Sequence, residues 1–220
     1  MRRFNLNTTV FQKYSLTSPE ICYLCSADKR LSVIIHKIGD LNYTIYTDTF
    51  SFLVKTIAGQ MLSNKVADII SSRLENLCNG YICVDKIRSL NLEKLRSIGL
   101  SKQKSEFILE LGEFIKENPS FFNNLDLLPD DAALRKLTEL RGIGTWTAKM
   151  YLIFVLNRLD ILPYEDGAFL RVYKWLYSTE DISPKSIIKQ CHSWHPYSSL
   201  AARYMYKALD SGLIQNYKLF

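Results

Sequence analysis

Several kinds of segment are missing from this sequence of 220 residues, and each absence excludes a class of protein. The longest apolar run, residues 150–156, is far shorter than the roughly 20 residues that cross a bilayer, so no membrane span is expected. The N-terminal stretch MRRFNLNTTVFQKY has no apolar segment after its charged start, which argues against a secretory signal peptide. No linker, low-complexity tract or internal repeat stands out, so residues 1–220 are expected to form a single functional unit.

Cysteine is scarce, and its five copies form an odd-numbered set. Such a set is typical of a reduced intracellular protein rather than of a disulfide-linked secreted one. Cys22 and Cys25 have CxxC spacing, but no second CxxC is present to complete a zinc site. We therefore expect no metal site, and we interpret these two cysteines as thiols on one face of a helix.

The charge balance is basic, with a formal net charge of +6 and a pI of about 9.0. Hydrophobic residues make up 47% of the chain and charged residues 23%, as in an ordinary globular protein. A basic protein suits an anionic partner, and nucleic acid is the common one. An equal alternative is that the excess of basic residues has no function. We expect a cytoplasmic, nucleoid-associated protein, or a nuclear one in a eukaryote.

Helix signals dominate after residue 45, whereas strand signals are weak throughout. Apolar residues recur at helical spacing, and helix N-caps are predicted at Thr47 or Asp48, Ser63, Ser101 and Ser183. Residues 31–36 and 41–47 fit strands, but each also fits a helix or a loop. The pattern predicts an all-α protein of short helices, in which residues 1–45 are the least defined part.

The stretch LRGIGTWTAKM, which begins at Leu140, joins two predicted helices through a pair of glycines. Gly142 and Gly144 let the chain reverse within a few residues. The free N–H groups of the second helix, which Thr145 is expected to cap, then point outward at the positive end of its dipole. A phosphate of a DNA backbone fits this position, with Lys149 one turn further on as a second contact. A purely structural αα-hairpin is the alternative, and in both cases Ile143 would pack between the two helices.

The pattern Leu-x-Gly-Ile-Gly-x-Trp-Thr-Ala resembles the helix-hairpin-helix DNA glycosylase superfamily that also carries a Gly/Pro-rich loop and an aspartate. Its GIGTWTA form resembles the 3-methyladenine DNA glycosylase II branch. ILPYEDGAFLR places Asp166 22 positions after Gly144, where that family has its aspartate. TFSFLVKTIAGQMLSNKVADIISSRL, SIGLSKQKSEFILELGEFI and SWHPYSSLAARYMYKALDSG are also similar to family segments. The resemblance covers residues 45–212, with the hairpin at 132–157 and residues 1–45 as an N-terminal wrap.

The resemblance implies two helical lobes with a cleft for DNA and a flipped-out base between them. It also implies a monofunctional glycosylase, because strand-cutting branches carry a lysine where this chain has Trp146. Asp166 would stabilise the oxocarbenium-like sugar, although a plain helix N-cap is the alternative role. Trp146 and Tyr206 are expected in the base pocket, with core packing as the alternative for Trp146; Tyr151 and Trp194 are expected in the core.

The DNA contacts that this reasoning predicts lie on the hairpin and on the helix pair before it: Gly142, Ile143, Gly144, Thr145, Thr147, Lys149, Gln60 and Ser63. For Gln60 the alternative is a polar residue that ends a helix. From residues 1–45, Tyr14, Tyr23 or Tyr43 could line the pocket, and the sequence does not choose among them. No cofactor is expected, with a monovalent cation at the hairpin carbonyls as an open alternative.

Two positions depart from the family pattern. Arg141 stands where the family usually has proline, which removes rigidity but adds charge beside the expected phosphate. Glu165 precedes Asp166 where paired aspartates are commoner, so Glu165 is a rival for the catalytic role. Only Cys191 follows the aspartate, so an iron–sulfur cluster is not expected.

The function that we predict is hydrolysis of alkylated purines, such as 3-methyladenine, from double-stranded DNA during base excision repair, by a monomer. A non-catalytic helix-hairpin-helix module that binds DNA is the first alternative. A glycosylase for an oxidised or deaminated base is the second, because the shape of the pocket decides between lesions.

Overall fold

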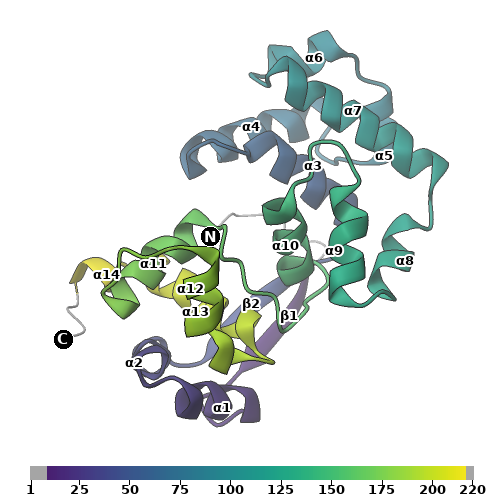
Figure 1. Ribbon diagram of the computed structural model, residues 1–220. Coiled ribbons are helices and arrows are strands. Elements are labelled where there is room, and N and C mark those ends of the chain that lie inside the picture. The colour runs from purple at the N-terminus through teal and green to yellow at the C-terminus, as the bar shows by residue number, and fades with distance from the viewer. Residues whose placement is uncertain (1–8, 217–220) are drawn as a thin grey trace. The chain divides into compact units, whose positions relative to one another are not determined.

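The computed structural model describes residues 9–216 and divides them into two compact units (Figure 1). One unit combines residues 9–45 with residues 157–216, so it is built from both ends of the chain. The other is the continuous segment Tyr46–Leu156. Residues 1–8, which belong to the predicted N-terminal wrap, lie outside the described residues. Among the described helices, none is long and apolar enough to cross a membrane.

The first unit contains a small two-stranded sheet, β1 paired with β2. Its elements from the N-terminal part are β1 (Thr9–Tyr14), α1 (Pro19–Ala27), α2 (Lys29–Ile38) and β2 (Leu41–Tyr46). Its elements from the C-terminal part are α11 (Gly167–Tyr177), α12 (Pro184–Gln190), a 3₁₀ turn (His192–Trp194), α13 (Ser198–Asp210) and α14 (Leu213–Asn216). Helix α13 packs against α2 and α11, so the two ends of the chain share one core.

The core of this unit joins residues that are far apart in the sequence. Ile21, Leu24 and Leu31 from α1 and α2 pack in one cluster with Phe169 from α11 and Trp194, and all five are 0% exposed. Burying side chains of this size stabilises a fold by roughly 1.5–3 kcal/mol each. Residues 9–45 are therefore an integral part of the unit.

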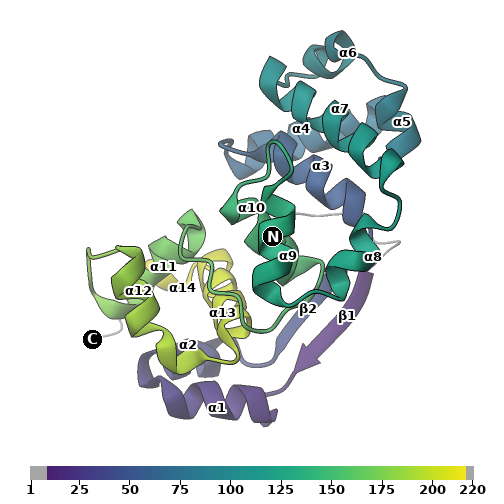
Figure 2. The same cartoon turned by 45° about the vertical axis from the view of Figure 1, so that its right-hand side comes forward.

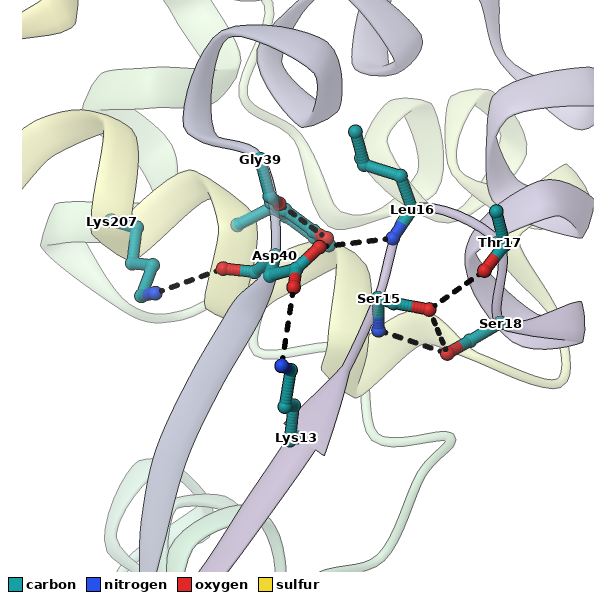
Figure 3. Close-up of polar contacts among 9 residues, drawn as sticks. Lys13, Ser15, Leu16, Thr17, Ser18, Gly39, Asp40 and Lys207 are labelled. Atoms are coloured by element: carbon teal, nitrogen blue, oxygen red, sulfur yellow. Dashed lines mark hydrogen bonds and ion pairs between the residues drawn. The ribbon is translucent and has the colours of Figure 1, made fainter.

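Polar contacts connect the start of β2 with β1 and α13 (Figure 3). The Asp40 carboxylate accepts a hydrogen bond from the Leu16 N–H at 3.2 Å and lies 3.6 Å from the Lys13 ammonium. Its main-chain carbonyl accepts from Lys207 of α13 at 3.5 Å. These contacts connect the residue before β2 with Lys13 of β1 and with α13, the helix that carries Tyr206.

The second unit is wholly helical (Figure 2). Its elements are α3 (Thr49–Gly59), α4 (Asn64–Leu77), α5 (Val84–Arg88), α6 (Leu92–Ser97), α7 (Lys102–Glu117), α8 (Phe121–Asp126), α9 (Asp130–Thr138) and α10 (Thr145–Phe154). Helix α7 packs against α3, α5 and α6, and α10 packs against α3 and α9. The glycine turn between α9 and α10 belongs entirely to this unit.

Four of the predicted helix starts are confirmed, and the fold is mostly helical as expected. Asp48, Ser63, Ser101 and Ser183 each accept a hydrogen bond from a backbone N–H of the helix that follows. Of the two stretches that fitted a strand, a helix or a loop, residues 41–46 form the strand β2. Residues 31–36 lie within α2, because Asp28 caps that helix through the N–H groups of residues 30 and 31. The prediction of an all-α protein missed the strand pair that β1 and β2 form.

Candidate functional site

The glycine turn reverses the chain between α9 and α10 within six residues, 139–144. The Ile143 N–H donates to the Leu140 carbonyl at 3.1 Å, which closes the turn. Ile143 is 4% exposed, in agreement with its predicted packing role. The apolar side chain of Ile143 thus faces inward, whereas Gly144 at the end of the turn is exposed.

Gly142 is required both by its backbone angles and by its neighbour. Its φ of 82° lies in the left-handed region, which residues with a Cβ rarely adopt. A Cβ at this position would also lie 2.4 Å from Cδ2 of Phe107, a residue of α7. Gly142 therefore serves the turn and its packing against α7, and no free space is left around it.

Gly144 is different, because nothing in the fold of the unit requires it. Its φ of −89° and ψ of 178° are extended, and a Cβ there would meet no atom within 4 Å. Gly144 is the N-cap of α10 and brings no capping side chain, so the first-turn N–H groups lie behind an open, exposed surface. Such a helix start binds anions well. Thr145 was expected to be the cap but is the first helical residue, and α10 ends at Phe154 instead of near Asn157.

Gln60 braces this hairpin from α3. Its amide donates to the Gly142 carbonyl at 2.8 Å and to the Thr147 hydroxyl at 3.1 Å. The main-chain carbonyl of Gln60 accepts a hydrogen bond from the ammonium of Lys104 at 2.6 Å. The same ammonium donates to the main-chain carbonyl of Ala58 at 3.0 Å. The structure confirms the simpler interpretation, a polar residue that ends a helix. A direct contact of Gln60 with DNA stays a prediction, and two hydrogen bonds within the unit already occupy the amide.

The other predicted DNA contacts differ in accessibility. Ser63 is exposed, and its hydroxyl caps α4 through the Val66 N–H at 3.4 Å. Thr147 is 1% exposed and Lys149 is 6% exposed, so neither side chain presents a surface to a phosphate. Burial therefore speaks against Lys149 as the second contact, and the backbone amides of the turn are better candidates. Trp146 is half-buried.

Met61 is a candidate that sequence reasoning missed. It follows Gln60 in the turn between α3 and α4, and it is fully exposed to solvent. Its φ of 57° is unusual for a residue with a Cβ. The adjacent Leu62 is 37% exposed, so two consecutive exposed apolar residues follow Gln60 in the chain. In the sequence, the only sign of this candidate is that two apolar residues stand between the end of one helix and Ser63, the N-cap of the next.

Asp166 lies in the first unit, where it caps α11. Its Oδ1 accepts a hydrogen bond from the Phe169 N–H at 2.8 Å, and the residue is only 8% exposed. The N-cap role that the sequence offered as an alternative is therefore real. A carboxylate at a helix start is stabilised by the helix dipole, and it has about four lone-pair sites, so capping uses only part of its capacity.

Helix α13 carries Tyr206, which is near Asp166, and Arg203, which is three residues earlier on the same helix. The Tyr206 hydroxyl is buried, although the residue as a whole is half-buried. Burial and the nearby Asp166 carboxylate together raise the pKa of Tyr206 well above its ordinary value, while Arg203 opposes that rise. Tyr206 is therefore a neutral phenol at physiological pH, and its buried hydroxyl is subject to the charge of Asp166. The contact to Asp166 could not be predicted from the sequence spacing.

Arg203 carries a buried positive charge next to this group. It is 5% exposed, and its guanidinium carbon lies 3.7 Å from the centroid of the Tyr43 ring, a cation–π contact. Tyr43 is 3% exposed and donates to Asn157 Oδ1 at 3.0 Å, so it belongs to the core rather than to a pocket surface. Tyr23 is 40% exposed and Tyr14 is half-buried, and the choice between them stays open. The two residues predicted in the core, Tyr151 and Trp194, are both 0% exposed.

The start of α13 holds the loop that leads to Asp166. Ser199 accepts the Ile161 N–H at 2.8 Å, and the Ser198 hydroxyl donates to Asp160 Oδ1 at 2.6 Å. The same helix therefore positions Tyr206 and fixes the segment before the aspartate. The sequence does not show that this serine pair belongs to the site, because its partners lie 38 positions earlier in the chain.

Glu165, the rival carboxylate, has different surroundings. It is half-buried, and together with burial its charge raises the pKa of Tyr164, its neighbour in the chain. Asp166 is the more buried of the two and is the one beside the Tyr206 hydroxyl. The geometry favours Asp166 for chemistry that needs a fixed, partly desolvated carboxylate.

The described residues include no group of three or more His, Cys, Asp or Glu that could hold a metal ion. Two hairpin carbonyls already accept hydrogen bonds, that of Leu140 from Ile143 and that of Gly142 from Gln60. Each carbonyl oxygen has two lone pairs, so a second partner still fits. A monovalent cation at the hairpin carbonyls stays a prediction.

The chain belongs to the HhH-GPD superfamily of base excision DNA repair proteins, whose family model matches residues 54–196. That match contains the Gln60 turn, the hairpin and Asp166.

Individual relatives are similar along most of the chain. A crystal structure of a DNA-3-methyladenine glycosidase from Bacillus halodurans is 32% identical, covers 94% of this chain and 96% of its own, and has a TM-score of 0.82. DNA-3-methyladenine glycosylase 1 of Schizosaccharomyces pombe is 28% identical over 200 residues, which are 88% of this chain and 87% of the relative. The S. pombe 3-methyladenine DNA glycosylase Mag1, solved in complex with abasic DNA, is 25% identical with a TM-score of 0.77, and the match covers 86% of this chain and 95% of that one.

Proposed function

We propose that this protein is a DNA glycosylase that hydrolyses the N-glycosidic bond of alkylated purines, such as 3-methyladenine, in base excision repair. The observation that carries the proposal is Asp166, a buried carboxylate at a helix start whose charge acts on the buried hydroxyl of Tyr206. Membership of the superfamily and the similarity to 3-methyladenine glycosylases support the same reaction.

The reaction suits a single carboxylate. The bond between C1′ of the deoxyribose and the ring nitrogen breaks, and its electron pair leaves with the base. A purine alkylated at a ring nitrogen is already cationic and departs neutral, so no second acid has to protonate it, unlike in most glycosidases. Asp166 stabilises the oxocarbenium-like sugar, and it can accept a proton from the water that adds to C1′. The proposed reaction needs no cofactor, because water is the nucleophile.

Base recognition is assigned to aromatic rings. A cationic base over an aromatic face gains about 0.5–2 kcal/mol, and a neutral base gains less. Trp146 is half-buried at the first turn of α10, so we propose it as the stacking residue. We propose the half-buried ring of Tyr206 as a second aromatic contact of the base.

The DNA backbone is assigned to the hairpin. The open surface in front of Gly144 leads to the first-turn amides of α10, which suits a phosphate. Met61 would enter the duplex as an apolar wedge, because minor-groove binders insert such side chains between base steps. The proposed partner is double-stranded DNA with a damaged base, bound by a monomer.

Monofunctional chemistry follows from the residue types at the hairpin. Trp146 cannot form a Schiff base, and Lys149 is 6% exposed. Borohydride reduction during the reaction should therefore trap no covalent adduct with damaged DNA. A trapped adduct would assign the chemistry to a lysine and would overturn the monofunctional part of the proposal.

The alternatives make different predictions for a panel of duplexes that each contain one lesion. The proposed enzyme releases alkylated purines and leaves an abasic site. Tight binding of damaged DNA without release of any base would favour the non-catalytic module. Release only of oxidised or deaminated bases would keep the enzyme but change its substrate.

A further inference from the structure

Arg141 stands at the hairpin, immediately before Gly142. Its side chain is 65% exposed, so the charge is available at the surface. Its guanidinium carbon lies 5.3 Å from the centroid of the Phe107 ring, the ring that a Cβ on Gly142 would strike. A single aromatic ring therefore supports the tightest point of the turn and the cation beside it.

The charge of Arg141 has a partner on α7. Its Nη1 forms an ion pair with Oε1 of Glu110, whose side chain is 43% exposed. A guanidinium has five N–H donors in a planar fork, which suits two oxygens of a carboxylate or of a phosphate equally well. The Glu110 carboxylate therefore engages a guanidinium whose geometry also suits a phosphate.

We propose that Arg141 is a DNA phosphate contact of the hairpin and that Glu110 competes with the phosphate for it. The inference rests on the proposed function, because it requires DNA as the partner. An exposed ion pair is worth roughly 1 kcal/mol or less, so binding can exchange Glu110 for a phosphate. In this chain a charged, switchable contact stands where the resemblance led us to expect a rigid proline.

The test measures affinity for a duplex with an abasic-site analogue by fluorescence anisotropy, between about 50 and 200 mM salt. Arg141→Gln should make the slope of log K against log salt shallower by about 1, because one phosphate contact is lost. Glu110→Gln should bind about two- to fivefold more tightly at low salt, because the competing pair is removed.

Glu113→Gln is the matched control on the same helix. Glu113 is 54% exposed and pairs with Arg88 at 2.9 Å rather than with the hairpin, so its loss changes net charge equally without freeing Arg141. The gain of Glu110→Gln over Glu113→Gln should disappear when both are made in Arg141→Gln. Thermal unfolding of each variant shows whether the fold is kept.

The outcomes separate the inference from the proposed function. Equal affinities for Glu110→Gln and Glu113→Gln, or an unchanged salt slope in Arg141→Gln, overturn the proposed contact and competition while leaving DNA binding intact. Failure of the unmodified protein to bind any duplex at low salt overturns both. A gain for Glu110→Gln that persists without Arg141 would show repulsion alone and also overturns the competition.

Discussion

The two glycines of the hairpin should respond oppositely to the same substitution. Gly142→Ala places a methyl group in the left-handed region, which costs roughly 1–2 kcal/mol. The methyl would also lie 2.4, 2.6 and 2.8 Å from three atoms of Phe107, and overpacking of this kind costs about 1–3 kcal/mol. We expect the free energy of unfolding to fall by about 2–5 kcal/mol.

Gly144→Ala should leave the fold almost unchanged. The backbone there is extended and the new methyl meets nothing, so the loss of chain entropy on folding is reduced by about 0.4–1 kcal/mol. Alanine is a poorer N-cap than glycine by a similar amount, which offsets the gain. The methyl would nevertheless stand in front of the α10 amides. Loss of one charged hydrogen bond, about 1.5 kcal/mol, should weaken DNA binding about tenfold.

Denaturant unfolding and anisotropy titration with a lesion-containing duplex measure the two effects separately. The expected pattern is lost stability in Gly142→Ala and lost affinity at normal stability in Gly144→Ala. Unchanged affinity in Gly144→Ala would refute the assignment of a phosphate to these amides. Unchanged stability in Gly142→Ala would refute the packing argument.

Three further predictions concern other parts of the site. Gln60→Leu should lower the free energy of unfolding by about 1–3 kcal/mol, because it removes both hydrogen bonds to the hairpin; an unchanged unfolding midpoint would contradict the brace. Met61→Ser should change stability by less than about 0.5 kcal/mol and weaken binding to damaged duplex, and unaltered affinity would exclude a wedge. Burial raises the pKa of Tyr151, Tyr204 and Tyr206 in the folded state. Their contribution to the free energy of unfolding is thus complete below about pH 10 and is lost as the pH rises above it, because these tyrosines ionise first in the unfolded chain. A free energy of unfolding that stays constant between about pH 9 and 11 in denaturant titrations would contradict this.

Local features of the fold could be read from the sequence. The caps at Ser63, Ser101 and Ser183 were predicted correctly, because an N-cap hydroxyl and the helix that it starts are adjacent in the chain. Asp166 was placed at a helix start for the same reason. Family motifs then supplied its proposed role, which no local pattern contains.

Contacts between distant segments could not be predicted. The hydrogen bonds of Gln60 join residues that are 82 and 87 positions apart in the sequence. The interactions of Tyr206 with Asp166 and of Arg203 with Tyr43 likewise join segments that are distant in the sequence. Lys149 was predicted to meet DNA because a positive residue at that spacing fits an exposed helix start. Its burial depends on how α10 packs, which the spacing does not specify.

The central claim is that Asp166 releases the base. Its most direct test is single-turnover release of 3-methyladenine from methylated duplex DNA by the unmodified protein, Asp166→Asn and Glu165→Gln. Asparagine caps helices about as well as aspartate, so Asp166→Asn should fold and bind DNA. We predict that Asp166→Asn releases base at least about a hundredfold more slowly, as expected for loss of transition-state electrostatics, and that Glu165→Gln stays close to the unmodified rate. Unimpaired release by Asp166→Asn, with the loss in Glu165→Gln instead, would contradict the account.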